Sequence, residues 1–337
     1  MSNARPHLSF FRLRFVLLVA PGPSVCARPV EECSSPVAEA VLASTKQMAV
    51  TIDDLPVASI RKDLATHRDI TDRLLETLSR AGLPAIGFVN ENKLLTDGKL
   101  DPERIALLER WLDAGLELGN HSYSHPDLHR VGLEDFKADV LRGETVLRQL
   151  LLRRGARPRY FRHPFLHTGR DLETKRALEE FLREIGYNVA PVTINNSEWM
   201  FALAYDRAHD RGDRGLKQKI SRTYVEYMDE ELTYYEMRAE KLFGRPIRHV
   251  LLLHANRLNA DHLGALLDRF RSAGYTFTSL DAALEDPAYG FEDRYTGREG
   301  MSWIHRWACA CGVDPSFFAG WPVVPEFVRR EAGVDSE

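Results

Sequence analysis

Short, mostly apolar runs alternate with longer amphipathic stretches from Gln47 to Thr278. Residues 48–52 (MAVTI) form one such run and are followed by two acids, which is typical of a buried strand in a parallel sheet. Residues 66–80 instead carry isoleucine and leucine at helical spacing, and Gly82 follows as a helix stop. A strand followed by a helix is therefore predicted over residues 47–82.

The same alternation continues along the chain. Further strands are predicted at 85–89, 116–120, 159–161, 187–193, 249–253 and 275–278. Further helices are predicted to begin at Asp101-Pro102 and to span 133–152, 171–185 and 260–272. Strands that alternate with helices in this way build a parallel α/β sheet or barrel.

Three segments depart from this alternation. Residues 1–45 lack periodicity and are predicted to be a leader and linker, so the domain is expected to occupy residues 46–285. Residues 200–245 predict a helical insertion, with one long helix at 221–242. After Asp286 the chain becomes irregular and aromatic, so residues 286–337 are predicted to be a C-terminal extension.

Composition and charge narrow the class of protein. The 337 residues include 44% hydrophobic and 28% charged residues, as in an ordinary globular protein, and the formal net charge is −4. Because there is no dense Lys/Arg tract either, a nucleic-acid-binding protein is excluded. A run of about 18 apolar residues is absent, so no membrane-spanning helix is predicted. The sequence does not indicate an oligomeric state.

The N-terminus has features of a secretory signal peptide. Three arginines precede the apolar run 15–20, and Val25-Cys26-Ala27 offers small residues for cleavage. The apolar run is short and prolines follow it, so a disordered tail or an unused upstream start is the alternative. The signal-peptide interpretation predicts a secreted or periplasmic protein.

Residues that can bind metals stand where predicted strands end, and the carboxyl ends of parallel strands are where sites gather. Asp53 and Asp54 follow the first strand. One of the two carboxylates can ligate a metal while its neighbour acts as a base. The alternative is that the pair forms a helix cap or a solvated turn. His121 and His125 are four residues apart, so on one helical turn both could reach one ion; surface histidines are the alternative.

Two further strand ends carry basic residues. Arg162 could orient a carboxylate, and the loop fixed by Pro164 could direct a backbone N–H at an oxyanion; an ordinary strand end is the alternative. His254 ends the apolar run 251–253. A lone histidine there is more often a core residue, but beside a metal it becomes a candidate general acid.

In their order along the chain, these four motifs resemble the polysaccharide deacetylase family (carbohydrate esterase family four) over residues 46–285. The resemblance implies a distorted (β/α) barrel with about seven parallel strands. It implies Asp54, His121 and His125 as metal ligands. Three protein ligands leave an open coordination position, as in catalytic sites. An Asp and two His suit Zn²⁺ best, and Co²⁺, Ni²⁺ or Mn²⁺ could serve.

The resemblance also implies catalytic roles. Asp53 would be the base, oriented by Arg162, and the backbone N–H of Phe165 would help to hold the oxyanion. His254 would protonate the leaving amine, and Leu253 or its neighbours would line the pocket for the acetyl methyl group.

One motif departs from the family pattern. The usual Asp-x-x-Asp-Trp, whose acid supports the arginine, is matched only by residues 195–199 (NNSEW). Glu198 is the tentative substitute in the support of Arg162.

The implied function is metal-dependent removal of acetyl from N-acetylated sugars of a poly- or oligosaccharide, a carbon–nitrogen bond hydrolysis. An acetyl-ester hydrolase acting on xylan, or a small-amide hydrolase of the same fold, is the alternative within hydrolases. An inactive carbohydrate-binding module is the alternative from another class. It is disfavoured because the base, the ligands and the acid are all present.

Overall fold

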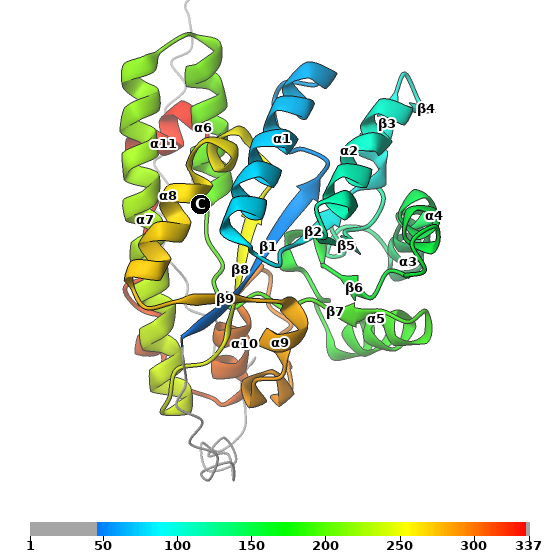
Figure 1. The fold of residues 1–337 in the computed structure, drawn as a ribbon. Helices are drawn as coiled ribbons and strands as arrows, with labels where there is room; N and C mark the ends of the chain where they lie inside the picture. Colours follow the sequence, from blue (N-terminus) through cyan, green and yellow to red (C-terminus); the bar gives the residue numbers. More distant parts are fainter. Residues whose placement is uncertain (1–45, 335–337) are drawn as a thin grey trace, which may run out of the picture.

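The computed structural model describes residues 46–334 (Figure 1). Its strands are β1 (Gln47–Leu55), β2 (Ile86–Val89), β3 (Leu95–Thr96), β4 (Lys99–Leu100), β5 (Glu117–Asn120), β6 (Tyr160–Phe161), β7 (Asn188–Val189), β8 (His249–His254) and β9 (Thr276–Thr278). Its α-helices are α1 (Leu64–Ala81), α2 (Pro102–Asp113), α3 (Leu133–Arg142), α4 (Thr145–Leu152), α5 (Leu172–Glu184), α6 (Glu198–Asp210), α7 (Arg214–Phe243), α8 (Arg257–Ser272), α9 (Leu280–Leu284), α10 (Trp303–Ala310) and α11 (Glu326–Ala332). Short 3₁₀ turns include η2 (Glu91–Leu94) and η3 (Pro164–Leu166).

The main sheet has seven strands in the order β7-β6-β5-β2-β1-β8, with β9 paired to β1, and all of its pairings are parallel. After β7 the chain runs on to Ile194, which forms a parallel bridge with Leu251 of β8. This bridge joins the two ends of the strand order, so the sheet curls into a distorted barrel. The predicted (β/α) barrel with about seven parallel strands is confirmed.

Strand β1 is the central element of this barrel. Its residues Met48 to Asp53 are buried, and it pairs with β2, β8 and β9. Helix α1 follows it with Asp63 as N-cap and Gly82 as left-handed C-cap, and buries Ile70, Leu74 and Leu78. Such side chains each contribute about 1.5–3 kcal/mol when fully buried, so this apolar stripe fixes α1 on the sheet.

The helical insertion is confirmed, with a difference in detail. The predicted single helix at 221–242 is α7, which begins earlier at Arg214 and is preceded by a second helix, α6. Helix α6 packs against α7, α8 and α11, and α10 packs against α7 (Figure 1). The extension after Asp286 therefore contributes helices α10 and α11 that pack on the insertion.

Two local predictions were wrong. The helix predicted at 133–152 is divided into α3 and α4 at Gly143 and Glu144. A Cβ on Gly143 would lie 2.4 Å from the backbone carbon of Ser122, so glycine permits this close approach to the loop that carries His121. The β3–β4 hairpin was not predicted at all, because its strands are two residues long and largely exposed.

The leader predicted at 1–45 and its cleavage point lie outside the described residues. Within residues 46–334, no helix is long and apolar enough to cross a membrane.

Candidate active site

The loop after β5 carries both histidines, but not on a helical turn as predicted. Residues 121–131 are not helical, and Ser122 and His125 have φ values of 65° and 58°. Asp139 of α3 holds this loop through the N–H groups of Tyr123 and Ser124, both 2.9 Å from its Oδ1. The two histidines are thus brought together by a tight loop with left-handed residues, and not by helical periodicity.

Asp54, His121 and His125 nevertheless converge. Their potential ligand atoms all lie within 4.8 Å of one another, and Asp54 Oδ1 is 4.0 Å from each imidazole Nε2. His121 Nδ1 lies 2.8 Å from the Arg162 carbonyl. Donation to that carbonyl leaves the Nε2 lone pair free for an ion, an arrangement common among metal-binding histidines. The sequence-predicted ligands therefore form one cluster.

The chemistry of this cluster fits a divalent cation. Asp54 Oδ1 is buried and accepts no hydrogen bond among the described residues, and the charge beside it is Lys93 Nζ at 3.2 Å. Burial alone would raise the pKa of Asp54, but Lys93 and the neighbouring imidazoles hold that pKa well below its usual value. Burial lowers the pKa of His121 and His125. An ionised carboxylate beside two neutral imidazoles is the donor set that Zn²⁺ prefers.

A second group, formed by Asp127, His129 and His167, also has potential ligand atoms within 4.8 Å. The rings of His129 and His167 are stacked at 3.9 Å with an interplanar angle of 8°. Lone pairs of nearly parallel, stacked rings cannot point at one ion. The rings of His121 and His125 stand at 80°, which allows both lone pairs to meet. The first cluster is therefore the better candidate metal centre.

Asp53 lies beside this cluster and is almost fully buried. Its Oδ2 is 3.7 Å from His121 Nε2, and its Oδ1 is 3.7 Å from Arg162 Nε. Burial raises the pKa of Asp53 to about 6, against the opposing effect of the Arg162 guanidinium. A carboxylate with such a pKa can accept a proton near neutral pH.

Arg162 is fully buried at the end of β6, where its Nη2 donates a 2.7 Å hydrogen bond to the Thr51 hydroxyl. Its guanidinium also lies 4.8 Å from the ring centre of Phe88. These contacts hold the arginine next to Asp53, as expected for a residue that orients the base.

His254 ends β8 directly opposite Asp53 in the register of β1 and β8. Its Nδ1 lies 2.8 Å from Glu198 Oε2. Burial alone would lower the pKa of His254, but the Glu198 carboxylate raises it to about 9. The histidine is therefore protonated at neutral pH and can donate a proton.

The assignment of Glu198 to the support of Arg162 is wrong. The side chain of Glu198 is fully buried, and its Oε1 accepts from the amides of Asn256 (2.5 Å) and Asn259, while Oε2 faces His254. Both carboxylate oxygens are thus engaged by His254 and by two asparagines, whereas the side chain of Arg162 contacts Thr51 and Asp53.

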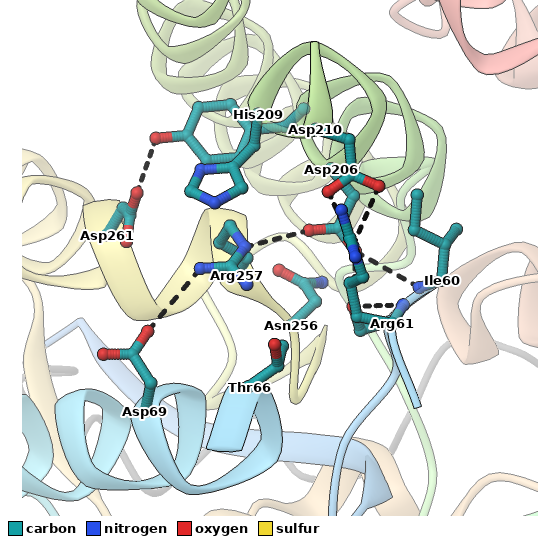
Figure 2. A network of polar contacts seen from close by, with 12 residues as sticks. Ile60, Arg61, Thr66, Asp69, Asp206, His209, Asp210, Asn256, Arg257 and Asp261 are labelled. Carbon is teal, nitrogen blue, oxygen red and sulfur yellow. Dashed lines mark hydrogen bonds and ion pairs between the residues drawn. The ribbon is translucent and has the colours of Figure 1, made fainter. Parts of the chain in front are cut away.

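Helix α6, which begins at Glu198, is tied to the rim of the barrel by Asp206. Figure 2 shows Asp206 between the loop after β1 and Arg257 of α8. Asp206 accepts from the Ser59 hydroxyl at 2.6 Å, and from Arg257 Nε at 3.2 Å. Arg257 also lies 3.5 Å from Asp69 of α1. These contacts fix α6 relative to the loop after β1 and to α8.

Phe165 lies on η3 with φ of 56°, and its ring packs edge-on against His125 at 4.5 Å. The residue predicted to supply an oxyanion N–H is therefore adjacent to the candidate metal cluster.

Leu252 shares a sheet face with His254, because side chains alternate along a strand, whereas Leu253 points to the other face. Among the leucines predicted near the acetyl group, Leu252 is the better placed.

Lys93, on η2, is a site residue that the sequence interpretation missed. Its Nζ lies 3.2 Å from Asp54 Oδ1 and donates to the Asp54 carbonyl at 3.0 Å. A lysine about 40 residues from its partner gives no local signal. Only the pairing of β1 with β2 brings the two together.

Comparison with known proteins finds a family to which part of the chain is similar. Residues 41–189 match the family described as "Polysaccharide deacetylase". The matched residues are similar to this family and make up slightly less than half of the chain. The resemblance inferred from the motifs is confirmed, although Glu198 and His254 lie beyond the matched residues.

Individual members of the polysaccharide deacetylase family are distant. A peptidoglycan-N-acetylglucosamine deacetylase of Bacillus cereus is 27% identical over 119 residues, which cover 35% of this chain and 36% of that protein. The chain thus spans about a third of the length of this curated relative.

Solved structures with detectable similarity include a family 4 carbohydrate esterase from Streptomyces lividans, with 17% identity, a TM-score of 0.45 and coverage of 71% of this chain and 95% of that one. The peptidoglycan deacetylase PdaC from Bacillus subtilis has 20% identity, a TM-score of 0.45 and coverage of 72% and 91%. A family 4 pseudoenzyme from Bacillus anthracis has 13% identity, a TM-score of 0.45 and coverage of 72% and 66%.

Proposed function

We propose that the protein is a metal-dependent hydrolase that removes acetyl groups from N-acetylated sugars of a poly- or oligosaccharide. One observation carries this proposal: a cluster of three potential ligands lies beside a buried carboxylate with a raised pKa, and that carboxylate is paired with a histidine whose pKa is raised by Glu198. The match of residues 41–189 to the polysaccharide deacetylase family and the name of the Bacillus cereus relative support the choice of substrate class.

Asp54, His121 and His125 would hold the cation, which we propose to be Zn²⁺. When bound, it would supply Lewis-acid polarisation of the acetyl carbonyl and lower the pKa of water toward about 7. The three donors leave coordination positions open, as this chemistry requires.

Asp53 would remove a proton from the attacking water as the oxygen–carbon bond forms at the acetyl carbonyl. Arg162, 3.7 Å from Asp53 Oδ1, would keep the carboxylate directed at the cluster. The N–H of Phe165 would donate a hydrogen bond to the oxygen of the tetrahedral intermediate.

His254 would give its proton to the sugar nitrogen as the carbon–nitrogen bond breaks. Acetate and a free amine would leave, and Glu198 would favour return of a proton to His254. Asp53 and His254 are paired residues of adjacent strands, which supports the proposal that base and acid would act on the same amide.

The test is acetate release from N-acetylglucosamine oligomers and from acetylated xylan, each with and without a chelator. We expect release from the oligomers, loss of activity with chelator, and recovery on addition of Zn²⁺. Release from xylan alone would indicate the ester hydrolase. Failure of the zinc-loaded protein to release acetate from either, while it binds the oligomers, would indicate a binding module.

Replacing Glu198 with Gln is expected to move the alkaline limb of the kcat profile to lower pH. His254 acts in its protonated form, so activity is present below its pKa and lost above it. Without the carboxylate, that pKa falls from about 9 toward the usual value of about 6.5. Measurement of kcat between pH 5 and 10 checks this.

The Glu198→Asp variant, which restores a carboxylate, serves as the matched control for the profile. An alkaline limb that stays in place in Glu198→Gln would remove Glu198 from the support of His254.

We also infer that the protein acts outside the cytoplasm. The basic, apolar and small residues over 5–27 support this proposal, and a glycan of the cell surface is a substrate found there. Detection of the protein in the exported fraction of its host tests it; retention in the cytoplasm would contradict it.

A further inference from the structure

The ammonium group of Lys93 lies against the carboxylate proposed as a metal ligand. Its Nζ is 3.2 Å from Asp54 Oδ1 and donates a 3.0 Å hydrogen bond to the Asp54 carbonyl. Among the lysines and arginines of residues 46–334, Lys93 alone lies within 4.0 Å of this carboxylate. Lys93 is therefore the basic side chain that contacts the proposed ligand Asp54 directly.

The turn that carries Lys93 is held in place on several sides. The Asn90 amide donates to the His121 carbonyl at 2.7 Å, and the Asn92 N–H donates to the Tyr123 carbonyl at 3.0 Å. Glu91 Oε1 accepts from the N–H groups of Val146 and Leu147 at the start of α4. The lysine is thus presented to Asp54 by a fixed backbone that also supports the histidine loop.

The oxygen near Lys93 is the one that faces both imidazoles. Asp54 Oδ1 lies 4.0 Å from His121 Nε2 and from His125 Nε2. An ammonium group and a divalent cation would each stabilise the negative charge of the carboxylate. When both lie beside the same oxygen, however, the two positive charges repel each other. The lysine therefore compensates Asp54 when the ion is absent and opposes the ion when it arrives.

We propose that Lys93 is the counter-cation of the metal site, which stabilises the metal-free protein and lowers its affinity for the divalent cation. This inference rests on the proposed metal-binding role of Asp54. A lysine of this kind keeps a buried carboxylate compensated while the protein folds without metal. By lowering the affinity for the divalent cation, Lys93 would also allow the bound ion to exchange with ions in solution.

Replacing Lys93 with Met is expected to have opposite effects on two measurements. The affinity for Zn²⁺ should rise about ten- to a thousandfold, the range expected for a charge a few ångströms away when the effective dielectric constant lies between about 80 and about 20. The Tm of the metal-free protein should fall by about 2–4 °C because Asp54 loses its partner. Zinc affinity is measured by competition with a chelating dye, and Tm by calorimetry with and without Zn²⁺.

Lys99→Met is the matched control, because Lys99 is exposed on β4 and forms no ion pair with Asp54. It removes the same charge and is expected to change zinc affinity less than about threefold. Lys93→Gln is the second variant, which removes the charge but retains a donor group; it should also bind Zn²⁺ more tightly.

A lysine that only supports the Asp54 backbone predicts another pattern. Zinc affinity that is unchanged or weaker in both Lys93 variants, together with a lower Tm, would overturn the proposal. Wild-type protein that binds no Zn²⁺ would instead overturn the metal site itself, and this inference with it. The two failures are therefore distinguished by the wild-type measurement.

Discussion

The Asp53→Asn variant is expected to lose about 10²–10⁴-fold in kcat while it retains its bound metal. Asparagine keeps the shape of the side chain but cannot accept a proton from water. Asp53 lies beside the ligand cluster, with Oδ2 3.7 Å from His121 Nε2, and it is not one of the three proposed ligands. Acetate release and metal content, measured on the same preparation, check both parts of the expectation.

The adjacent Asp54→Asn variant is the matched comparison. The same chemical change one residue later is expected to lose both metal and activity, because Asp54 Oδ1 faces both imidazoles. Near-normal activity in Asp53→Asn would remove Asp53 from the role of base. Loss of metal from Asp53→Asn would make it a ligand.

The His125→Ala variant is expected to bind Zn²⁺ more than about 100-fold more weakly and to lose activity with it. Removal of one of three protein ligands leaves Asp54 and His121, too few to hold the ion tightly. The loss of a group that only hydrogen-bonds to a ligand lowers metal affinity about 10–100-fold, so the loss of a ligand itself should exceed that range. The zinc content after dialysis measures the effect.

His167→Ala provides the control for this variant. His167 belongs to the second group of potential ligands, whose stacked rings cannot direct their lone pairs at one ion. This variant is expected to retain one zinc ion per chain. The reverse result, with metal lost in His167→Ala and kept in His125→Ala, would move the metal site to the second group.

Most of the barrel could be predicted from the sequence because each buried strand is an apolar run that ends in polar residues. The run before Asp53, and the one before His254, gave both the strands and the place of the site, since parallel strands end at one edge of the barrel. The same rule brought His121 and Arg162 to that edge.

The local geometry of the site could not be predicted in the same way. The His-x-x-x-His spacing suggested a helical turn, whereas left-handed residues Ser122 and His125 make the loop. That loop depends on Gly143 and Asp139, which lie on a different element. Spacing alone cannot distinguish the two conformations, because both bring the imidazoles together.

The charged partners of the site were missed or misassigned because they come from distant segments. Glu198 reaches His254 across 56 residues of sequence, and Lys93 reaches Asp54 across 39. The motif around Glu198 indicated that an acidic residue supports a basic side chain of the site. Whether that side chain is Arg162 or His254 follows only from the position of α6. The extent of the catalytic domain, predicted as residues 46–285, stays a prediction.

Anomalous diffraction at the zinc edge, from crystals grown with Zn²⁺, tests the central claim most directly. We expect one strong peak about 2.0–2.2 Å from an Asp54 oxygen and from Nε2 of both His121 and His125. A peak at Asp127, His129 and His167, or a fully zinc-loaded crystal with no peak beside Asp54, would contradict the account.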